Sequence, residues 1–263
     1  MHILDEIVAH KKKEVQERLS FKPRKELEKS TLFNRPTISL KESVRNKARH
    51  GIIAEIKRKS PSKGIINPKV SVEKISKGYV EAGASAISVL TDNYYFGGSS
   101  EDLTQVRELN QCPVLRKDFI VHEYQVVEAK AIGADAILLI AGTVSGSELK
   151  RLSKLANSLG LEILLEVHNE EELRQTLDVP ADLIGVNNRN LQTFEVSLNV
   201  SRYLIGKIPK GITAVSESGI ETPSTIKELR ELGYSGFLIG QYFMQNGSPE
   251  TACKEFIQQL KLA

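Results

Sequence analysis

Short apolar runs alternate with longer amphipathic segments along most of this chain. In four places a segment with helical periodicity closes on glycine and an apolar run follows at once, as in YVEAGASAISVL, AKAIGADAILLI, ANSLGLEILLEV and RELGYSGFLIG. Continuous apolar runs are typical of parallel strands that are buried on both faces, and a glycine after a periodic segment is typical of a helix end. The pattern therefore predicts repeated units of helix followed by strand.

Eight strands are predicted in this way. They cover residues 51–57, 86–92, 112–118, 136–142, 162–167, 183–188, 212–218 and 236–241. Each is followed by a plausible helix, and eight such units favour an α/β fold, the closed (β/α)8 TIM barrel. An open doubly wound sheet is the alternative. That fold more often carries a glycine-rich dinucleotide turn after its first strand, and EIKRKSPSKG is not such a turn.

Residues 1–48 precede the first strand and have a different pattern. Helices are predicted at 4–19 and 40–48, with a polar stretch at 22–36 between them. Because this segment has too few apolar positions for a core of its own, we expect a single domain over residues 1–263, with 1–48 as an N-terminal helical extension over the barrel mouth. The KKK run at 11–13 is interpreted as a solvated helix face.

Composition indicates which binding partners and which cellular compartment to expect. The chain has 263 residues, with 36 basic and 33 acidic side chains, and its net charge of +3 does not suggest a nucleic-acid partner. Its start lacks the features of a secretory signal, and no apolar run has membrane-spanning length, so we expect a cytoplasmic protein without a membrane partner. Cys112 and Cys253 are interpreted as reduced structural thiols, and no metal site is predicted.

Charged and polar side chains gather where the predicted strands end. They are Glu55 and Lys57 on the first strand, Lys117 on the third, Glu166 on the fifth, Asn187 and Arg189 at the sixth, and Glu217 and Ser218 on the seventh. In a closed barrel these ends meet at one mouth. A single pair there can be purely structural, but burying several charges is costly unless they are paired, so we predict a polar ligand cavity.

Two details of this mouth follow from spacing. Glu55 and Lys57 lie two residues apart, roughly 6.6 Å along a strand, and point the same way, so Glu55 is expected to hold Lys57 charged and oriented. Gly219 in SESGI and Gly240 in LIGQ each follow an apolar run at the last two strands. Barrels commonly bind phosphate at this corner.

Five segments together resemble the signature segments of the indole-3-glycerol phosphate synthase family. They are IIAEIKRKSPSKG, LRKDFIVHEYQVVEAKAIGADAILLI, LLEVHNEEEL, IGVNNRNLQTFEV and VSESGI, in the family's order and spacing. The resemblance implies a small phosphorylated substrate, 1-(2-carboxyphenylamino)-1-deoxyribulose 5-phosphate. It also implies ring closure to indole-3-glycerol phosphate with loss of CO2 and water, without a cofactor and without an obligate protein partner.

The resemblance also implies roles for single residues. Lys117 would be the general acid of ring closure and Glu166 the general base of the later dehydration. Lys57, aligned by Glu55, would hold the substrate carboxylate. The other implied contacts are Asn187, Glu217 and Ser218 to the sugar hydroxyls and polar side chains, Arg189 as positive charge, Phe119 against the anthranilate ring, and Ser60, Gly219 and Gly240 for the phosphate. Gln241, where the family more often has a small residue, departs from the pattern at the phosphate corner.

Three other functions are considered. A phosphoribosylanthranilate isomerase would resemble this chain in fold but relies on a cysteine and an aspartate, and no cysteine stands at the carboxyl end of a predicted strand. A lysine-dependent aldolase would use Lys117 to form a Schiff base. A barrel that only binds a phosphorylated metabolite is the third, and the intact Glu55, Lys57, Lys117 and Glu166 argue against it.

Overall fold

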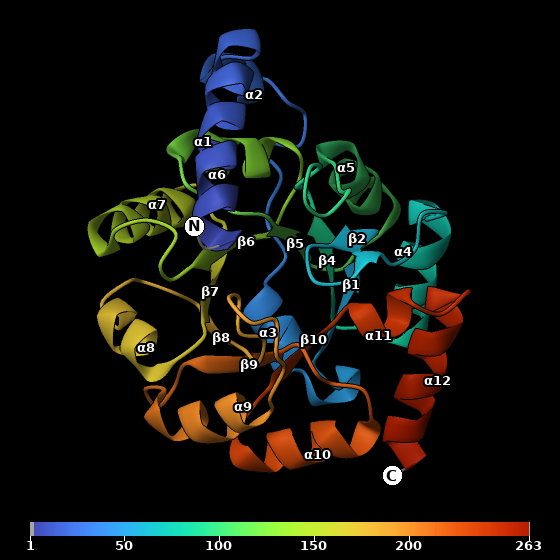
Figure 1. The fold of residues 1–263 in the computed structure, drawn as a ribbon. Coiled ribbons are helices and arrows are strands. Elements are labelled where there is room, and N and C mark those ends of the chain that lie inside the picture. Colours follow the sequence, from blue (N-terminus) through green and yellow to red (C-terminus); the bar gives the residue numbers. More distant parts are fainter. Residues whose placement is uncertain (1–2, 263) are drawn as a thin grey trace.

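Eight parallel strands close into a barrel in a computed structural model that describes residues 3–262 (Figure 1). Around the barrel the order is β1, β10, β9, β8, β7, β6, β5 and β4, and β4 pairs with β1. The strands are β1 (Ile52–Ile56), β4 (Ala86–Leu90), β5 (Val114–Lys117), β6 (Ala136–Ile140), β7 (Glu162–Val167), β8 (Leu183–Asn187), β9 (Thr213–Glu217) and β10 (Gly236–Ile239). The predicted (β/α)8 barrel is confirmed, and the open sheet is excluded.

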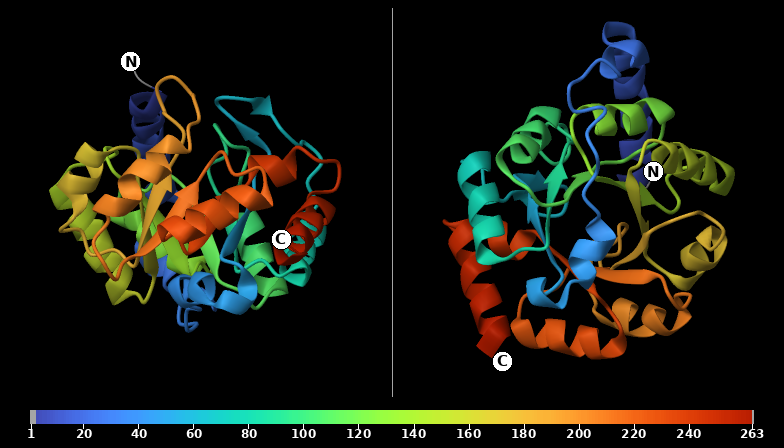
Figure 2. Two further views of the ribbon diagram at one scale, coloured as in Figure 1. Left: turned by 90° about the horizontal axis from the view of Figure 1, so that it is seen from below. Right: turned by 180° about the vertical axis from the view of Figure 1, so that it is seen from behind.

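Helices form a ring outside the barrel (Figure 2). Those that follow the strands are α4 (Val72–Ala82), α5 (Ser100–Leu109), α6 (Glu123–Ala131), α7 (Gly146–Ser158), α8 (Glu170–Thr176), α9 (Asn199–Leu204), η2 (Ile205–Lys207), α10 (Pro223–Leu232), α11 (Gln241–Met244) and α12 (Pro249–Leu262). Before the first strand lie α1 (Ile3–Phe21), α2 (Arg24–Leu27), α3 (Leu40–Arg45) and η1 (Lys47–Arg49). A small hairpin, β2 (Lys59–Ser60) and β3 (Gly64–Ile65), follows β1. Among residues 3–262, no helix is both long and apolar enough to cross a membrane.

The helix boundaries follow from local chemistry. Ser71 caps α4 by accepting a hydrogen bond from the Lys74 backbone N–H, and Gly83 ends that helix in the left-handed region at φ 102°. Ser145 and Glu148 form a capping box at the start of α7. The Gly83 stop is one of the glycine signals on which the sequence pattern relies.

Alternation along the strands builds two apolar layers. Side chains such as Ile53, Leu115 and Leu164 fill the barrel interior, whereas Ile52 and Ile87 belong to the larger core between barrel and helices. Because successive strand residues point to opposite faces, each interior apolar residue is followed two positions later by another inward residue. At the carboxyl ends these inward positions are polar, and they form the floor of the site.

Only part of the N-terminal extension lies at the barrel mouth, whereas the sequence pattern predicts all of it there. Ile3 and Leu4 of α1 line the cavity at the mouth, but α3 lies at the opposite, amino-terminal end of the barrel (Figure 2). There Leu40 and Val44 pack on the interior apolar cluster, and the Ser43 hydroxyl donates to the Ser85 carbonyl at 2.5 Å. The physical reason is that the amino-terminal end of the barrel is apolar and open, and the two apolar side chains of α3 close it.

The interpretation of the KKK run as a solvated face is wrong for Lys11. Lys12 and Lys13 are exposed, but Lys11 is only 1% exposed and its Nζ lies 2.7 Å from Asp92 and 3.0 Å from Asp118. Both carboxylates sit at the strand ends against which α1 packs, so they compensate the buried ammonium. Burial would raise the pKa of Asp118, but Lys11 and Arg116 lower it to about 2.

Candidate active site

A cavity of about 410 Å³ opens at the carboxyl ends of the barrel strands. Every site residue predicted from the sequence lines it: Glu55, Lys57, Ser60, Lys117, Phe119, Glu166, Asn187, Arg189, Glu217, Ser218, Gly219, Gly240 and Gln241. They come from β1, β5, β7, β8 and β9, from the hairpin strand β2 that carries Ser60, and from the segments that follow these strands and β10. Closure of the barrel brings them together. The structure therefore assembles the whole predicted set in one place.

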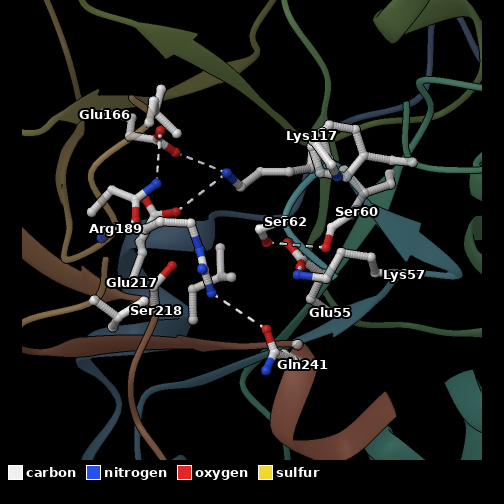
Figure 3. A pocket seen from close by; sticks show the side chains of 18 of the residues that line it. Glu55, Lys57, Ser60, Ser62, Lys117, Glu166, Arg189, Glu217, Ser218 and Gln241 are labelled. Carbon is white, nitrogen blue, oxygen red and sulfur yellow. Dashed lines mark hydrogen bonds and ion pairs between the residues drawn. The ribbon is translucent and has the colours of Figure 1, made fainter. Parts of the chain in front are cut away.

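Lys117 lies at the centre of the charged floor (Figure 3). Its Nζ is 2.8 Å from Glu166 Oε2 and 3.3 Å from Glu217 Oε2. Asn187 donates from Nδ2 to the other oxygen of Glu166 at 3.1 Å. The two carboxyl groups and the ammonium thus share one buried pocket contributed by β5, β7 and β9.

This arrangement separates the protonation states of the two carboxyl groups. Burial would raise the pKa of Glu166, but Lys117 and His168 hold it well below the ordinary value. Burial raises the pKa of Glu217 to about 8, and the charge of Glu166 adds to the rise while Lys117 opposes it. Glu166 is therefore held as the carboxylate, and Glu217 is the carboxyl group that binds a proton more readily. Two titratable groups driven apart in this way are a common feature of acid–base sites.

Lys117 itself is held in the charged form. Burial alone would lower its pKa, but Glu166, Glu217 and Glu55 together raise it above the ordinary lysine value. An ammonium in that position is a donor aimed into the cavity, and it is not a free amine nucleophile.

Glu55 and Lys57 form the ion pair that their spacing suggests. Lys57 Nζ lies 2.8 Å from Glu55 Oε1, and the Ser88 hydroxyl donates to Glu55 Oε2 at 3.4 Å. Glu55 is 3% exposed whereas Lys57 is half-buried and reaches the cavity. The carboxylate therefore orients a lysine that stays accessible to a ligand.

Two glycines inside the barrel make room for these carboxyl groups. A Cβ at Gly240 would lie 2.4 Å from Glu55 Oε1, and one at Gly185 would lie 2.2 Å from Glu217 Oε1. The sequence predicts that Gly240 admits a phosphate to the main chain. The structure gives this glycine a further reason, since its missing side chain leaves space for Glu55. Gly185 escapes the sequence reasoning, although two-residue alternation on β8 places it on the same face as Asn187.

Ser218 occupies a strained turn at the end of β9. Its φ of 67° lies in the left-handed region, which residues other than glycine seldom adopt. The buried Asn188 amide donates to the carbonyls of Glu217 and Ser218 at 3.0 and 3.1 Å, so it holds this turn in place. Asn188 lies between two cavity residues in sequence but points away from the cavity. Asn188 is uncharged, so a pattern of charged residues at strand ends does not identify it.

Arg189 and Gln241 meet across the mouth (Figure 3). Arg189 donates from Nη2 to Gln241 Oε1 at 3.3 Å and from Nη1 to the Phe194 carbonyl at 3.1 Å. Burial lowers the pKa of Arg189 from its ordinary value. The residue that departs from the family pattern is therefore a hydrogen-bond partner of the cation at this corner.

One wall of the cavity is apolar. Phe119 is 8% exposed, its ring centroid lies 5.9 Å from that of Phe96, and Leu138 and Ile140 of β6 line the same cavity. Ile7 of α1 contributes to this wall from above. The cavity thus has an apolar side for a ring and a charged side for anionic and hydroxyl groups.

His168 is the residue next to this site that the sequence reasoning leaves without a role. It follows β7 directly, and its Nε2 lies 3.2 Å from Glu166 Oε1. A signal for it exists, because His168 stands two positions after Glu166, the same spacing that joins Glu55 to Lys57.

Comparison with known proteins decides the family. The family model described as indole-3-glycerol phosphate synthase matches residues 4–256. This chain belongs to the indole-3-glycerol phosphate synthase family. Proteins named indole-3-glycerol phosphate synthase from Bacteroides thetaiotaomicron and from Caldanaerobacter subterraneus subsp. tengcongensis are 42% and 44% identical to it, and each comparison covers 98% of this chain and 99% of the relative.

Solved structures agree on the fold of this family member. A thiamine phosphate pyrophosphorylase from Pyrococcus furiosus superposes with a TM-score of 0.60 over 83% of this chain and 98% of the other, at 19% identity. A structure titled "Native KDPGal structure" gives a TM-score of 0.56 at 12% identity, over 80% of this chain and 92% of that chain. At these identities the likeness concerns the barrel alone.

Proposed function

We infer that this chain is an indole-3-glycerol phosphate synthase, which converts 1-(2-carboxyphenylamino)-1-deoxyribulose 5-phosphate to indole-3-glycerol phosphate, CO2 and water. The main ground for assigning this reaction is that the chain belongs to the family. The placing of Lys117 between Glu166 and Glu217 at the base of a half-apolar cavity is the observation that supports it. As a small-molecule enzyme of amino-acid synthesis, it is expected in the cytoplasm and without a required cofactor or protein partner.

Ring closure is assigned to Lys117. The aromatic carbon that bears the carboxylate must attack the ketone carbon, and a proton must reach the ketone oxygen as its electrons move outward. The Lys117 ammonium is a donor held in the charged form at the floor of the cavity. Loss of CO2 then returns the electron pair of the broken bond to the ring.

Dehydration is assigned to Glu166. After CO2 has left, the new ring must lose the hydroxyl group of the former ketone carbon together with a proton. Glu166 is a carboxylate at neutral pH and lies 2.8 Å from Lys117, so a base and an acid stand side by side. Glu166 takes the proton as Lys117, which solvent has reprotonated after ring closure, protonates the departing hydroxyl, and the hydroxyl leaves as water.

The remaining residues would hold the substrate. Lys57, oriented by Glu55, faces the substrate carboxylate, and Asn187, Glu217 and Ser218 face the hydroxyl groups. The aromatic ring would lie against Phe119, and Ser60, Gly219, Gly240 and Arg189 line the part of the cavity proposed for phosphate. Gln241 acts there through its contact with Arg189.

The structure bears on two rival reactions. An isomerase that relies on cysteine is disfavoured because Cys112 and Cys253 are buried and do not line the cavity. A Schiff-base aldolase needs Lys117 as a neutral amine, whereas its neighbours keep it charged. Borohydride treatment in the presence of substrate distinguishes the two roles of Lys117: proton transfer leaves the protein mass unchanged, and an imine would be trapped as added mass.

The direct test is to supply the carboxyphenylamino-deoxyribulose phosphate and follow indole fluorescence. The expected result is a rise in fluorescence with release of one CO2 per product. A protein that binds this substrate without forming an indole would support the non-catalytic barrel instead.

A further inference from the structure

His168 lies between two carboxylates at the edge of the charged floor. Its Nε2 is 3.2 Å from Glu166 Oε1, and its Nδ1 is 3.0 Å from Glu172 Oε2 of α8. The Glu172 oxygen also accepts the backbone N–H of His168 at 2.8 Å. The imidazole side chain is 10% exposed and does not line the cavity, so it can influence a ligand only through Glu166.

A carboxylate oxygen near each ring nitrogen favours a proton on both, although the contact of Nε2 with Glu166 is a charge–charge approach and not an aligned hydrogen bond. A neutral imidazole has one N–H and one lone pair, so one of its nitrogens would direct a lone pair at a carboxylate oxygen. A doubly protonated ring instead presents positive charge to both. Burial works to lower the pKa of His168, but Glu166 and Glu172 raise it to about 10.

Other charges near this residue are already engaged elsewhere. On α8, Glu170 pairs with Lys207 and accepts from Tyr203, and Glu171 accepts from Gln175. Lys117 stands on the far side of Glu166. The groups with the largest effect on the charge of His168 are therefore Glu166 and Glu172.

We propose that His168 is a positioning residue for Glu166: as an imidazolium held by Glu172, it places positive charge 3.2 Å from Glu166 Oε1 and so keeps Glu166 ionised, with Asn187 on the same oxygen and Lys117 on Oε2. The inference rests on the proposed role of Glu166 as a base. Glu166 accepts a proton only in the dehydration step. It therefore has to stay ionised while Lys117 acts in ring closure. Lys117 alone does not secure this, because its ammonium also contacts Glu217 Oε2 at 3.3 Å.

The ionisation is tested without any activity measurement. Protein labelled with ¹³C at histidine Cε1 is titrated by NMR, and His168→Gln identifies the His168 signal among the five histidines. The signal is expected to keep its imidazolium shift up to pH 8.5. A midpoint near the ordinary value of about 6.5 would overturn the proposal.

The effect on chemistry is tested with Glu172→Gln. Glutamine retains an oxygen that can accept from the His168 backbone, so the start of α8 is kept, but the negative charge is lost and the pKa of His168 falls. Below its new pKa the histidine stays charged, and above it the histidine is neutral. The single-turnover rate is therefore expected to match wild type at pH 6 and to fall about tenfold behind it at pH 9, with KM within about twofold.

Glu171→Gln is the matched control, since it removes the same charge one position away without touching His168. It should follow wild type at every pH. If Glu172→Gln kept the wild-type single-turnover rate at both pH values, or lost the same factor at pH 6 and pH 9, His168 would have only a structural role. These outcomes can be told apart from a failure of the proposed function. A fully active Glu166→Gln would refute the role of Glu166 as the base. An inactive Glu166→Gln, together with an ordinary pKa for His168 in the NMR titration, would refute only the role of His168.

Discussion

At the scale of single residues, the site depends on Lys117 being charged and placed between two carboxyl groups. Lys117→Met keeps the volume of the stem and removes the donor. Ring closure should fall by at least about a hundredfold, the usual contribution of general acid catalysis, in a protein that remains folded. Steady-state fluorescence and a thermal melt check the two parts, and turnover within about tenfold of wild type would remove Lys117 from the acid role.

Glu166 is expected to act later than Lys117. Glu166→Gln keeps an acceptor and donor at the same place but cannot take up a proton at neutral pH. Dehydration should therefore slow, so that a ring-closed species still carrying the hydroxyl accumulates in a single turnover. Rapid quench with mass detection measures it. Normal rates without such a species would assign the base to another residue.

Gly240 and Gln241 are neighbours with different expected sensitivities. In Gly240→Ala the new Cβ would lie 2.4 Å from Glu55 Oε1, so the Glu55–Lys57 pair has to move. Overpacking of this kind costs about 1–3 kcal/mol, and product inhibition should weaken about tenfold or more. Gln241→Ser removes one hydrogen bond to Arg189 and should cost less than about 1 kcal/mol.

Product inhibition constants of both variants provide the comparison. A larger loss in Gln241→Ser than in Gly240→Ala would show that the side chain at position 241, and not the space at position 240, controls binding at this corner.

At the scale of elements, two helices of the N-terminal extension, α1 and α3, lie at opposite ends of the barrel. Leu4 of α1 is half-buried at the mouth, and Leu40 of α3 is fully buried at the other end of the barrel. Leu4→Ser should raise KM about three- to tenfold with little change in the melting temperature, because it removes part of the apolar wall over the substrate. We propose that the start of α1 acts as a flap in this sense.

Leu40→Ala is the matched variant at the opposite end. It should lower the free energy of unfolding by about 2–5 kcal/mol and leave KM unchanged, since it opens a cavity far from the site. Denaturant unfolding and initial rates on both proteins test the pair. If Leu40→Ala changed KM as much as Leu4→Ser does, the assignment of separate roles to α1 and α3 would fail.

At the scale of the whole molecule, stability should depend on the protonation of Glu217. Its pKa is raised by burial to about 8, so the folded protein binds a proton that the unfolded chain has lost above about pH 4.5. This contribution is fully present below pH 4.5 and is lost as the pH rises through 8. Glu217→Gln resembles the protonated form at every pH. It should be more stable than wild type at pH 9 by about 1–3 kcal/mol and similar to wild type at pH 5.

Denaturant unfolding of both proteins at pH 5, 7 and 9 measures this difference. A stability gap that does not widen with pH would show that Glu217 is ionised in the folded protein at neutral pH, and that Lys117 outweighs its burial.

Patterns between near neighbours in the chain are enough to predict the strands, their number and their inward-facing ends. Alternation within one strand is local, so it places Glu55 beside Lys57 and identifies Lys117, Glu166 and Glu217 as cavity residues. The order of βα units also predicts that these ends meet, because closure of eight parallel strands leaves one mouth.

Contacts between groups on different elements depend instead on register and on helix docking. Among them are the burial of Lys11 against Asp92 and Asp118, the closure of the far end by α3, and the space that Gly240 leaves for Glu55. A single-sequence pattern reports how hydrophobic each face is. The buried charge of Lys11 is compensated by residues about 80 and 107 positions away in the chain, and only the folded chain brings them together.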